Sequence, residues 1–284
     1  MGSEYVKPIL CILMTVCLCC AHTSCGAKTE ETPALRVIFL DVGEGDCTLL
    51  RTPEGDVLID AGSESSQDTL CRKLEALGVT RLELMILTHG DEDHIGGADG
   101  VLARFPAKEI WVSRTQGSSE AYDRLKTANE KAIICRLSDH TVKTVGGVSF
   151  FAFAPLKNAS TVSENDGSIV LKVTCGNASA LFTGDMSASH EAMLVDFYGA
   201  RHLSCDLYKV AHHGASDANS QILLEAASPA FAVISCGADN AYGHPHGEVL
   251  LRLQQIGARV YRTDLSGDIT FDCDGERFFP ITRN

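Results

Sequence analysis

The sequence predicts a mixed α/β (α+β) protein whose strands and helices alternate within one domain. From Leu35 to Ile281, short apolar runs typical of strands alternate with segments whose apolar residues recur at helical spacing. This region shows no repeat of fixed period, no heptads and no low-complexity linker. A chain of 284 residues is long enough for one large domain or two small ones, and the unbroken alternation favours one.

The charge balance argues against a protein that grips nucleic acid through a broad basic surface. The net charge is −13 and the isoelectric point is about 5.2. A nuclease whose metal ions neutralise phosphate locally is still allowed, and its binding to nucleic acid would be weak and metal-dependent. The hydrophobic content of 45% and the charged content of 21% are ordinary for a globular protein.

Residues 1–26 resemble a secretory signal, and 27–34 form a polar tether. The apolar stretch Pro8–Ala21 is too short for a comfortable membrane span. The small residues before Cys25 resemble a bacterial lipoprotein processing site, with His22 where that pattern has leucine. We therefore expect an exported protein, extracellular or anchored to the outer face of a bacterial membrane through Cys25. An ordinary cleaved signal and a retained anchor are the alternatives.

Cysteine usage predicts no disulfide framework in the domain. Five of the 12 cysteines lie in the first 25 residues, and the other seven are scattered without a C-x-x-C pair. Because seven is odd, complete pairing is not expected. Most of these cysteines, such as Cys47, Cys175 and Cys236, lie in apolar strand-like runs and are expected to pack as small core residues.

Each expected element follows from a local pattern. Strands are expected at Leu35–Val42, Cys47–Arg51, Val57–Gly62, Leu82–Leu87, Ile110–Ser113, Ala132–Leu137, Val148–Ala154, Asn165–Val173, Ala178–Phe182, Asp206–Ala211, Phe231–Cys236, Asp268–Asp272 and Arg277–Ile281. Helices are expected at Gln67–Leu77, Gly97–Phe105, Ser118–Lys131, around His190 and His202, and from about Pro245 to Ile256. Pro and Gly at 52–56 predict a hairpin turn, and Gly78 closes the first helix.

The segment from Leu82 to Gly97 carries the densest group of metal-type ligands. Its apolar strand ends in a loop with two imidazoles and three carboxylates within six residues: His89, Asp91, Glu92, Asp93 and His94. No packing requirement explains so many ligands at the end of a core strand, and these are the donors that divalent ions prefer. The alternative is a polar, solvated turn.

Three later segments place similar side chains after expected strands. Asp185 follows one strand, although a lone aspartate is weak evidence. On an extended chain His212 and His213 would point to opposite sides, so one would face the metal and the other structure or substrate. His244 lies near a helix start, where backbone N–H groups can meet an anion; helix capping is the alternative.

The motifs resemble those of a known family. The ligand loop resembles the H-x-H-x-D-H motif of the metallo-β-lactamase fold, with Asp91 where most members carry the second histidine. Further stretches are similar to D-V-G-Q-G-D, with Glu44 for Gln, and to N-D-x-S-x-V-L, T-G-D, K-V-x-H-H-G-S and N-x-Y-G-H-P-H-x-E-V-L. Together they resemble the hydrolase domain of ComEC-type competence proteins, which take up DNA, from about Leu35 to Ile281.

The resemblance implies an αββα sandwich over 35–284, with two sheets face to face and helices outside. It implies two divalent ions, Zn or Mn, at the edge of that sandwich. The implied ligands are His89 and Asp91 for one ion, Asp93 and His94 for the other, Asp185 as a bridge, and His212 or His213 to complete the shell. Position in the motif slightly favours His212.

Other residues of these motifs are implied to support the ligands or to contact the substrate: Asp60, Asn165, Ser168, Lys209, Asn240 and Tyr242. Asp60 would brace the metal loop by hydrogen bonds. Asn165 or Ser168 would line the site where many lactamase-fold enzymes carry a histidine, or would simply be turn residues that start a strand.

The resemblance further implies an exported hydrolase that cleaves phosphodiesters such as DNA or short oligonucleotides with metal-activated water. Asp93 would orient the water, and His244 would contact the scissile phosphate or protonate the leaving group. Two alternatives stay open: a hydrolase of esters, thioesters or lactams on the same fold, and a surface protein with a relic site. The channel domain of the competence proteins has no counterpart in this sequence, so we do not expect a transporter.

Overall fold

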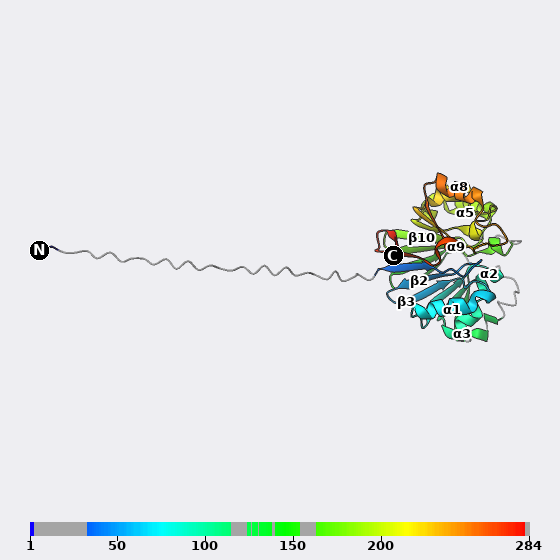
Figure 1. The fold of residues 1–284 in the computed structure, drawn as a ribbon, viewed down its shortest axis with the longest axis horizontal. Helices are drawn as coiled ribbons and strands as arrows, with labels where there is room; N and C mark the ends of the chain where they lie inside the picture. The colour runs from blue at the N-terminus through cyan, green and yellow to red at the C-terminus, as the bar shows by residue number, and fades with distance from the viewer. Residues whose placement is uncertain are drawn as a thin grey trace. The chain divides into compact units, whose positions relative to one another are not determined.

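Two β-sheets packed face to face form the centre of the fold, with helices on both outer sides (Figure 1). The structure, a computed structural model, describes residues 1–2, 33–114, 124–125, 127–129, 131–137, 140–153 and 163–281. The expected signal sequence, with Cys25, therefore lies outside the described residues except for its first two. The tether is described only from residue 33.

The first sheet has eight strands, which follow one another across the sheet as β15 (Phe278–Ile281), β14 (Ile269–Cys273), β1 (Leu35–Phe39), β2 (Thr48–Thr52), β3 (Gly55–Ile59), β4 (Leu82–Leu87), β5 (Glu109–Ser113) and β6 (Ile133–Leu137). The second has seven, in the order β13 (Arg259–Arg262), β12 (Phe231–Ile234), β11 (Leu207–Lys209), β10 (Ala178–Phe182), β9 (Leu171–Cys175), β8 (Val148–Ala152) and β7 (Thr141–Val145).

Helices cover the outer face of each sheet. On the first sheet lie α1 (Gln67–Ala76) and α3 (Ala98–Arg104), and on the second lie α5 (Ala188–Tyr198), α7 (Gln221–Ala227) and α8 (Gly247–Gln255). Short helices α2 (Glu92–Ile95), α6 (Ala200–Leu203) and α9 (Thr263–Ser266) complete the described set. The expected αββα sandwich is confirmed. None of the helices in the described ranges combines the length and apolar character that a membrane crossing requires.

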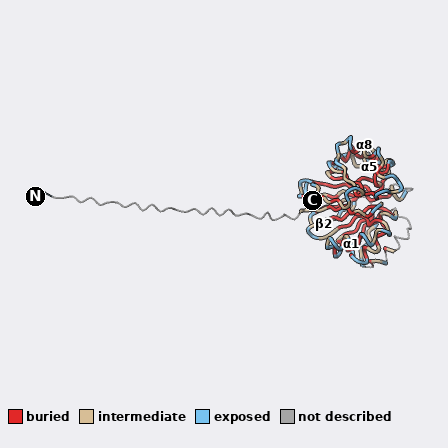
Figure 2. Tube along the Cα trace, viewed as in Figure 1, coloured by how far each residue is buried: buried red, intermediate tan, exposed pale blue. Residues whose placement is uncertain are grey.

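The core follows from the alternation of side chains along each strand. In β1, Leu35, Val37 and Phe39 face the second sheet, where Phe39 stacks on Phe182 with ring centroids 6.1 Å apart. Ile38 points the other way, into the cluster beneath α1 and α3. Figure 2 shows the buried positions gathered along the strands between the helical layers. All seven cysteines of the described region are free, and all but one are buried, as expected.

The sequence-based elements are wrong in several places, since β13, α2, α7 and α9 were not expected. The strand expected at Asn165–Val173 begins only at Leu171, because Asn165–Gly167 forms a 3₁₀ turn whose Asp166 accepts hydrogen bonds from Ser163 and Ser187. Strand β7 was not expected, since its alternating Thr, Val and Lys residues lack an apolar run. Most of the helix expected at Ser118–Lys131 lies outside the described residues.

The topology gathers the polar segments at one edge of the sandwich. Strands β3, β4 and β5 run parallel in the first sheet, and β10, β11 and β12 run parallel in the second. The carboxyl ends of parallel neighbours meet at one edge, which is where open α/β sheets place their sites. The ligand loop follows β4, Asp185 follows β10, and the two adjacent histidines follow β11.

A candidate metal centre

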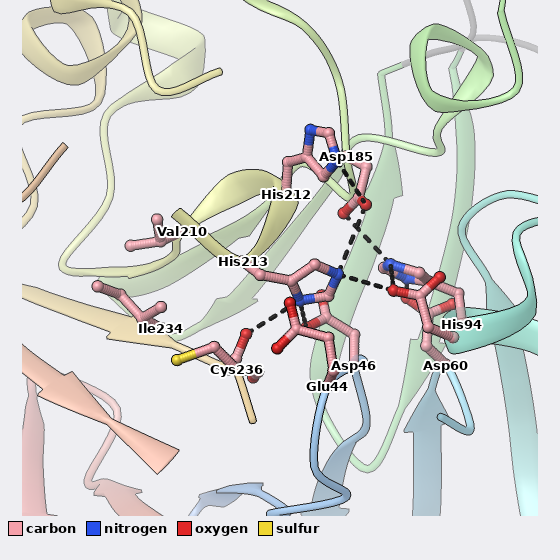
Figure 3. Close-up of polar contacts among 12 residues, drawn as sticks. Glu44, Asp46, Asp60, His94, Asp185, Val210, His212, His213, Ile234 and Cys236 are labelled. Carbon is pink, nitrogen blue, oxygen red and sulfur yellow. Dashed lines mark hydrogen bonds and ion pairs between the residues drawn. The ribbon is translucent and has the colours of Figure 1, made fainter. Parts of the chain in front are cut away.

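Asp185 lies at the centre of a cluster of imidazoles drawn from both sheets (Figure 3). Its Oδ1 atom is 3.3 Å from His94 Nε2, and its Oδ2 atom is 3.6 Å from His213 Nε2. His89 Nε2 and His212 Nε2 each lie 3.9 Å from the same Oδ2 atom. One buried carboxylate therefore faces four imidazoles, an arrangement in which its two oxygens can serve two ions.

The ligand loop reaches Asp185 because the chain turns into the short helix α2 directly after β4. Asp91 stands at the N-cap of α2, and His94 is completely buried within it. Gly45 of the loop between β1 and β2 packs against this turn; a Cβ there would lie 2.5 Å from the carbonyl oxygen of Asp93. The N–H of Asp46 donates to that same carbonyl at 3.1 Å, so the two loops fit closely.

Asp60 fixes the orientation of His94. Its carboxylate accepts hydrogen bonds from the backbone N–H and the hydroxyl of Thr88, both at 2.8 Å, and lies 2.9 Å from His94 Nδ1. A carboxylate oxygen only accepts, so Nδ1 carries the proton and Nε2 faces Asp185. Asp60 therefore supports His94 through hydrogen bonds and does not line the open pocket that leads to the cluster.

His212 and His213 do not lie on an extended chain, so that part of the prediction is wrong. Both adopt left-handed backbone conformations, with φ of 49° and 52°, and both side chains turn toward Asp185. His213 is buried and lies 3.0 Å from Asp93 Oδ2, and its Nδ1 donates to the carbonyl of Ser235 at 2.9 Å. His213, and not His212, joins Asp93, His94 and Asp185 in the tight cluster.

Atoms without hydrogen-bond partners show that this cluster fits a metal ion. Nε2 of His89, of His94 and of His213, together with Oδ1 of Asp185, are buried and have no hydrogen-bond partner among the described residues. Three imidazole nitrogens and one carboxylate oxygen that converge in this way match the preferences of divalent transition metals. Leaving such atoms unpaired would otherwise be costly. The residues present therefore fit a divalent metal site.

The charges of the cluster depend on one another. Burial alone would raise the pKa of Asp185, but His94 and His213 outweigh it and hold that pKa well below its usual value. Burial alone would lower the pKa of both histidines. The carboxylates of Asp185 and Asp60 instead raise the pKa of His94 well above 6.5, and those of Asp185, Asp46 and Asp93 raise that of His213 to about 10. In the absence of a metal cation, the surrounding carboxylates therefore favour the protonated, positively charged form of these imidazoles.

Lys209 lies behind the cluster and does not line the pocket. Its side chain is 3% exposed, and Nζ lies 2.8 Å from Asp46 Oδ2. Asp46 Oδ1 in turn lies 3.5 Å from His213 Nδ1.

Ser168 also supports the centre, since its hydroxyl accepts the backbone N–H of Asp185 at 3.1 Å. Asn165 is half-buried in the 3₁₀ turn, where its carbonyl accepts the N–H of Ser168.

An open pocket of about 500 Å³ leads to the cluster. Its lining comes from both sheets: Glu44, Ser63, Ser65, Asp91, Glu92, Asp93, Asp185, His212, His213, Tyr242 and His244. This lining contains five carboxylates and no lysine or arginine among the described residues. An anionic substrate would be repelled unless cations were bound.

His244 faces this pocket and makes no capping bond. It precedes the N-cap residue of α8, and its Nδ1 lies 2.8 Å from Glu44 Oε1. Burial lowers the pKa of His244 below its usual value, although Glu44 opposes the shift. Sequence reasoning noted Glu44 only as a departure from a motif. No local signal pairs it with a histidine 200 positions away.

The family model for the metallo-beta-lactamase superfamily matches residues 40–238, and the chain belongs to that superfamily. Family and site together define a metal-dependent hydrolase related to competence proteins. The chain is 34% identical over 236 residues to competence protein ComA of Neisseria gonorrhoeae, covering 83% of this chain and 32% of that protein. It is 30% identical over 255 residues to ComE operon protein 3 of Bacillus subtilis, with the same coverage. The chain thus spans about a third of the length of these relatives.

A solved structure supports the fold. The metallo-beta-lactamase fold protein YhfI from Bacillus subtilis superimposes with a TM-score of 0.55 at 14% identity, covering 81% of this chain and 96% of that one.

Proposed function

We propose that this protein is a phosphodiesterase that cleaves DNA or short oligonucleotides with two bound divalent ions, Mn or Zn. The observation that carries the proposal is the set of buried imidazole nitrogens without partners around Asp185. The similarity to competence proteins supports a nucleic-acid substrate.

The ligands divide into two groups that share Asp185. Asp93, His94 and His213 form one group, whose ligand atoms all lie within 4.8 Å of one another. His89 and Asp91 form the other; His89 Nε2 lies 3.7 Å from Asp91 Oδ2. The second group is rich in oxygen, which favours Mn as much as Zn. Two ions in such a site supply water of lowered pKa and neutralise the charge that develops on a phosphodiester.

The protein's own residues would position the substrate around these ions. Asp93 pairs with His213 through Oδ2, but it is a third exposed, so its carboxylate can also orient a water molecule at the pocket floor. His244 presents Nε2, because Glu44 engages Nδ1. In this position Nε2 can contact the phosphate or, when protonated, release a proton to the leaving oxygen. The acidic lining makes substrate entry depend on the ions.

The test is hydrolysis of single-stranded and double-stranded DNA by the full chain with added Mn²⁺ or Zn²⁺. Asp93→Ala is the test variant, and Asp196→Ala, an exposed residue of α5, is the matched control. We expect cleavage that needs metal, is lost in Asp93→Ala and is retained in Asp196→Ala. Bound metal without cleavage would exclude the nuclease and favour another ester, thioester or lactam. Absence of metal would favour a relic site.

We also propose export, with a lipid anchor at Cys25. Labelled palmitate should be incorporated into the wild-type chain and not into Cys25→Ser when both are made in a bacterium. Labelling of both, or of neither, would contradict the anchor, and recovery of the protein inside the cell would contradict export.

A further inference from the structure

Tyr242 is an aromatic residue at the pocket whose exposed position is not explained by burial in the core. Its side chain is 68% exposed although it lines the pocket. Its ring lies 5.4 Å from that of His244 at an interplanar angle of 15°. The His244 ring in turn lies 6.0 Å from that of His213 at 28°. Three neighbouring aromatic rings, Tyr242, His244 and His213, therefore lead from solvent to the cluster around Asp185.

The loop that carries Tyr242 is held by hydrogen bonds and not by burial of the ring. Asn240 Oδ1 accepts the backbone N–H groups of Tyr242 at 3.2 Å and of His244 at 2.9 Å. Asn240 Nδ2 donates to the carbonyls of Gly237 at 2.9 Å and of His244 at 2.8 Å. Glu44 Oε2 accepts the N–H of Gly237 at 2.7 Å. The ring is thus presented in one position while it adds little to the core.

We propose that Tyr242 is the surface on which a nucleobase next to the scissile phosphate stacks. The inference rests on the proposed function and deepens it: the substrate is a nucleotide chain with unpaired bases and not a simple diester. Stacking is tolerant of sequence because every base has a π face, and it needs a base outside a duplex. An acidic pocket cannot hold the backbone through lysine or arginine, so ring stacking supplies the affinity that charge does not.

The surroundings of Tyr242 favour this substrate over a protein partner. Protein interfaces centre aromatic anchors in apolar, well-packed patches. Around Tyr242 the pocket lining is carboxylate, hydroxyl and imidazole. A pocket of about 500 Å³ also falls in the usual size range for small-molecule and cofactor sites.

The first test measures binding and needs no catalysis. Thymidine 5′-monophosphate and deoxyribose 5-phosphate, which lacks the base, are titrated in Mn²⁺ by calorimetry. We expect the wild-type chain and Tyr242→Phe to bind the nucleotide about ten- to a hundredfold more tightly than the sugar phosphate. In Tyr242→Ala the nucleotide affinity should fall to the wild-type level for the sugar phosphate. Phe197→Ala, which removes a 65% exposed ring from α5, should behave as wild type.

Equal binding of the two ligands by the wild type, or a preference for the nucleotide that survives in Tyr242→Ala, would overturn the proposal. A second test compares hydrolysis of a dithymidine diester with that of its abasic analogue. We expect Tyr242→Ala to raise KM for the base-bearing substrate more than it lowers kcat. If no diester is cleaved but the binding preference holds, only the proposed function fails. If diesters are cleaved and Tyr242→Ala keeps the preference for bases, only the inference fails.

Discussion

The Nδ1 atom of His244 lies 2.8 Å from Oε1 of Glu44, and the two residues come from loops next to different sheets. The second oxygen of Glu44 accepts the N–H of Gly237 at 2.7 Å. One carboxylate therefore joins the loop after β1 to the loop after β12. Because it can only accept, it fixes the proton of neutral His244 on Nδ1 and leaves Nε2 to face the pocket.

Glu44→Ala should lower kcat more than Glu44→Gln does, with little change in KM. An amide can still hold the ring through its oxygen, whereas alanine leaves His244 without an orienting partner. For Glu44→Ala we expect kcat to fall about tenfold, because His244 would no longer be held in its reactive position. Glu44 also raises the pKa of His244. Because His244 acts in its protonated form, removal of Glu44 should move the alkaline limb that belongs to His244 to lower pH in the rate profile. Equal kcat values for both variants and the wild type would contradict a positioning role.

Metal binding should release protons. The raised pKa of His213, about 10, keeps it charged at pH 7 in the metal-free protein, and the pKa of His94 is raised as well, so we expect at least one proton to leave when an ion binds both. Calorimetry in buffers of different ionisation enthalpy measures this number. Because the folded-state pKa of His213 is raised, its stabilisation of the metal-free fold is complete below pH 6.5 and is lost as the pH rises through about 10.

Metal should therefore raise the melting temperature more at pH 8 than at pH 6. His213→Ala should lose most of this rise. His202→Ala, an exposed histidine of α6, should keep it. A rise that does not depend on pH would show that the imidazoles are not the ligands.

Breaking the buried pair of Asp46 and Lys209 should destabilise the fold strongly. Asp46→Asn leaves an ammonium group unpaired in the interior, which costs about 3–5 kcal/mol. Burial alone would raise the pKa of Asp46, but Lys209, His213 and His94 together outweigh it and lower that pKa. The stabilisation is therefore present above pH 3.8 and is lost as the pH falls further.

The coupling of this pair is tested by urea unfolding of Asp46→Asn, of Lys209→Met and of the double variant that carries both substitutions. The double variant should lose less than the sum of the single losses. Glu248→Gln, in an exposed pair with Arg252, should change stability by less than about 0.5 kcal/mol. Additive losses from Asp46 and Lys209 would contradict a direct pair.

Asp60→Asn should weaken metal binding by about ten- to a hundredfold, because supporting hydrogen bonds of this kind orient a ligating imidazole. Both oxygens of Asp60 accept hydrogen bonds, one from the N–H of Thr88 and one from Nδ1–H of His94, whereas asparagine has one acceptor oxygen, so one of these two donors loses its partner. Competition with a chelator measures the affinity. Asp68→Asn on the exposed side of α1 is the control, and an unchanged affinity in Asp60→Asn would remove Asp60 from the site.

The parts of the site that follow from sequence are those encoded by local patterns. Apolar runs that end in histidine and aspartate marked the loop after β4 and the residue after β10. The parts that do not follow depend on contacts between distant segments. Nothing near Lys209 shows that it faces Asp46, and nothing near Glu44 shows that it meets His244. The left-handed turn at His212 and His213 also escaped prediction, because non-glycine residues rarely adopt it.

The ligand set has a mechanical consequence for the whole sandwich. Asp93 and His94 follow β4 of the first sheet, while Asp185 and His213 follow β10 and β11 of the second. An ion held by all four would act as a cross-link between layers, closing a long loop as a disulfide does. In a protein whose cysteines are free throughout its described residues, such a cross-link would hold the two layers together where no disulfide does. Loss of the ion would then loosen the layers from each other as well as empty the site.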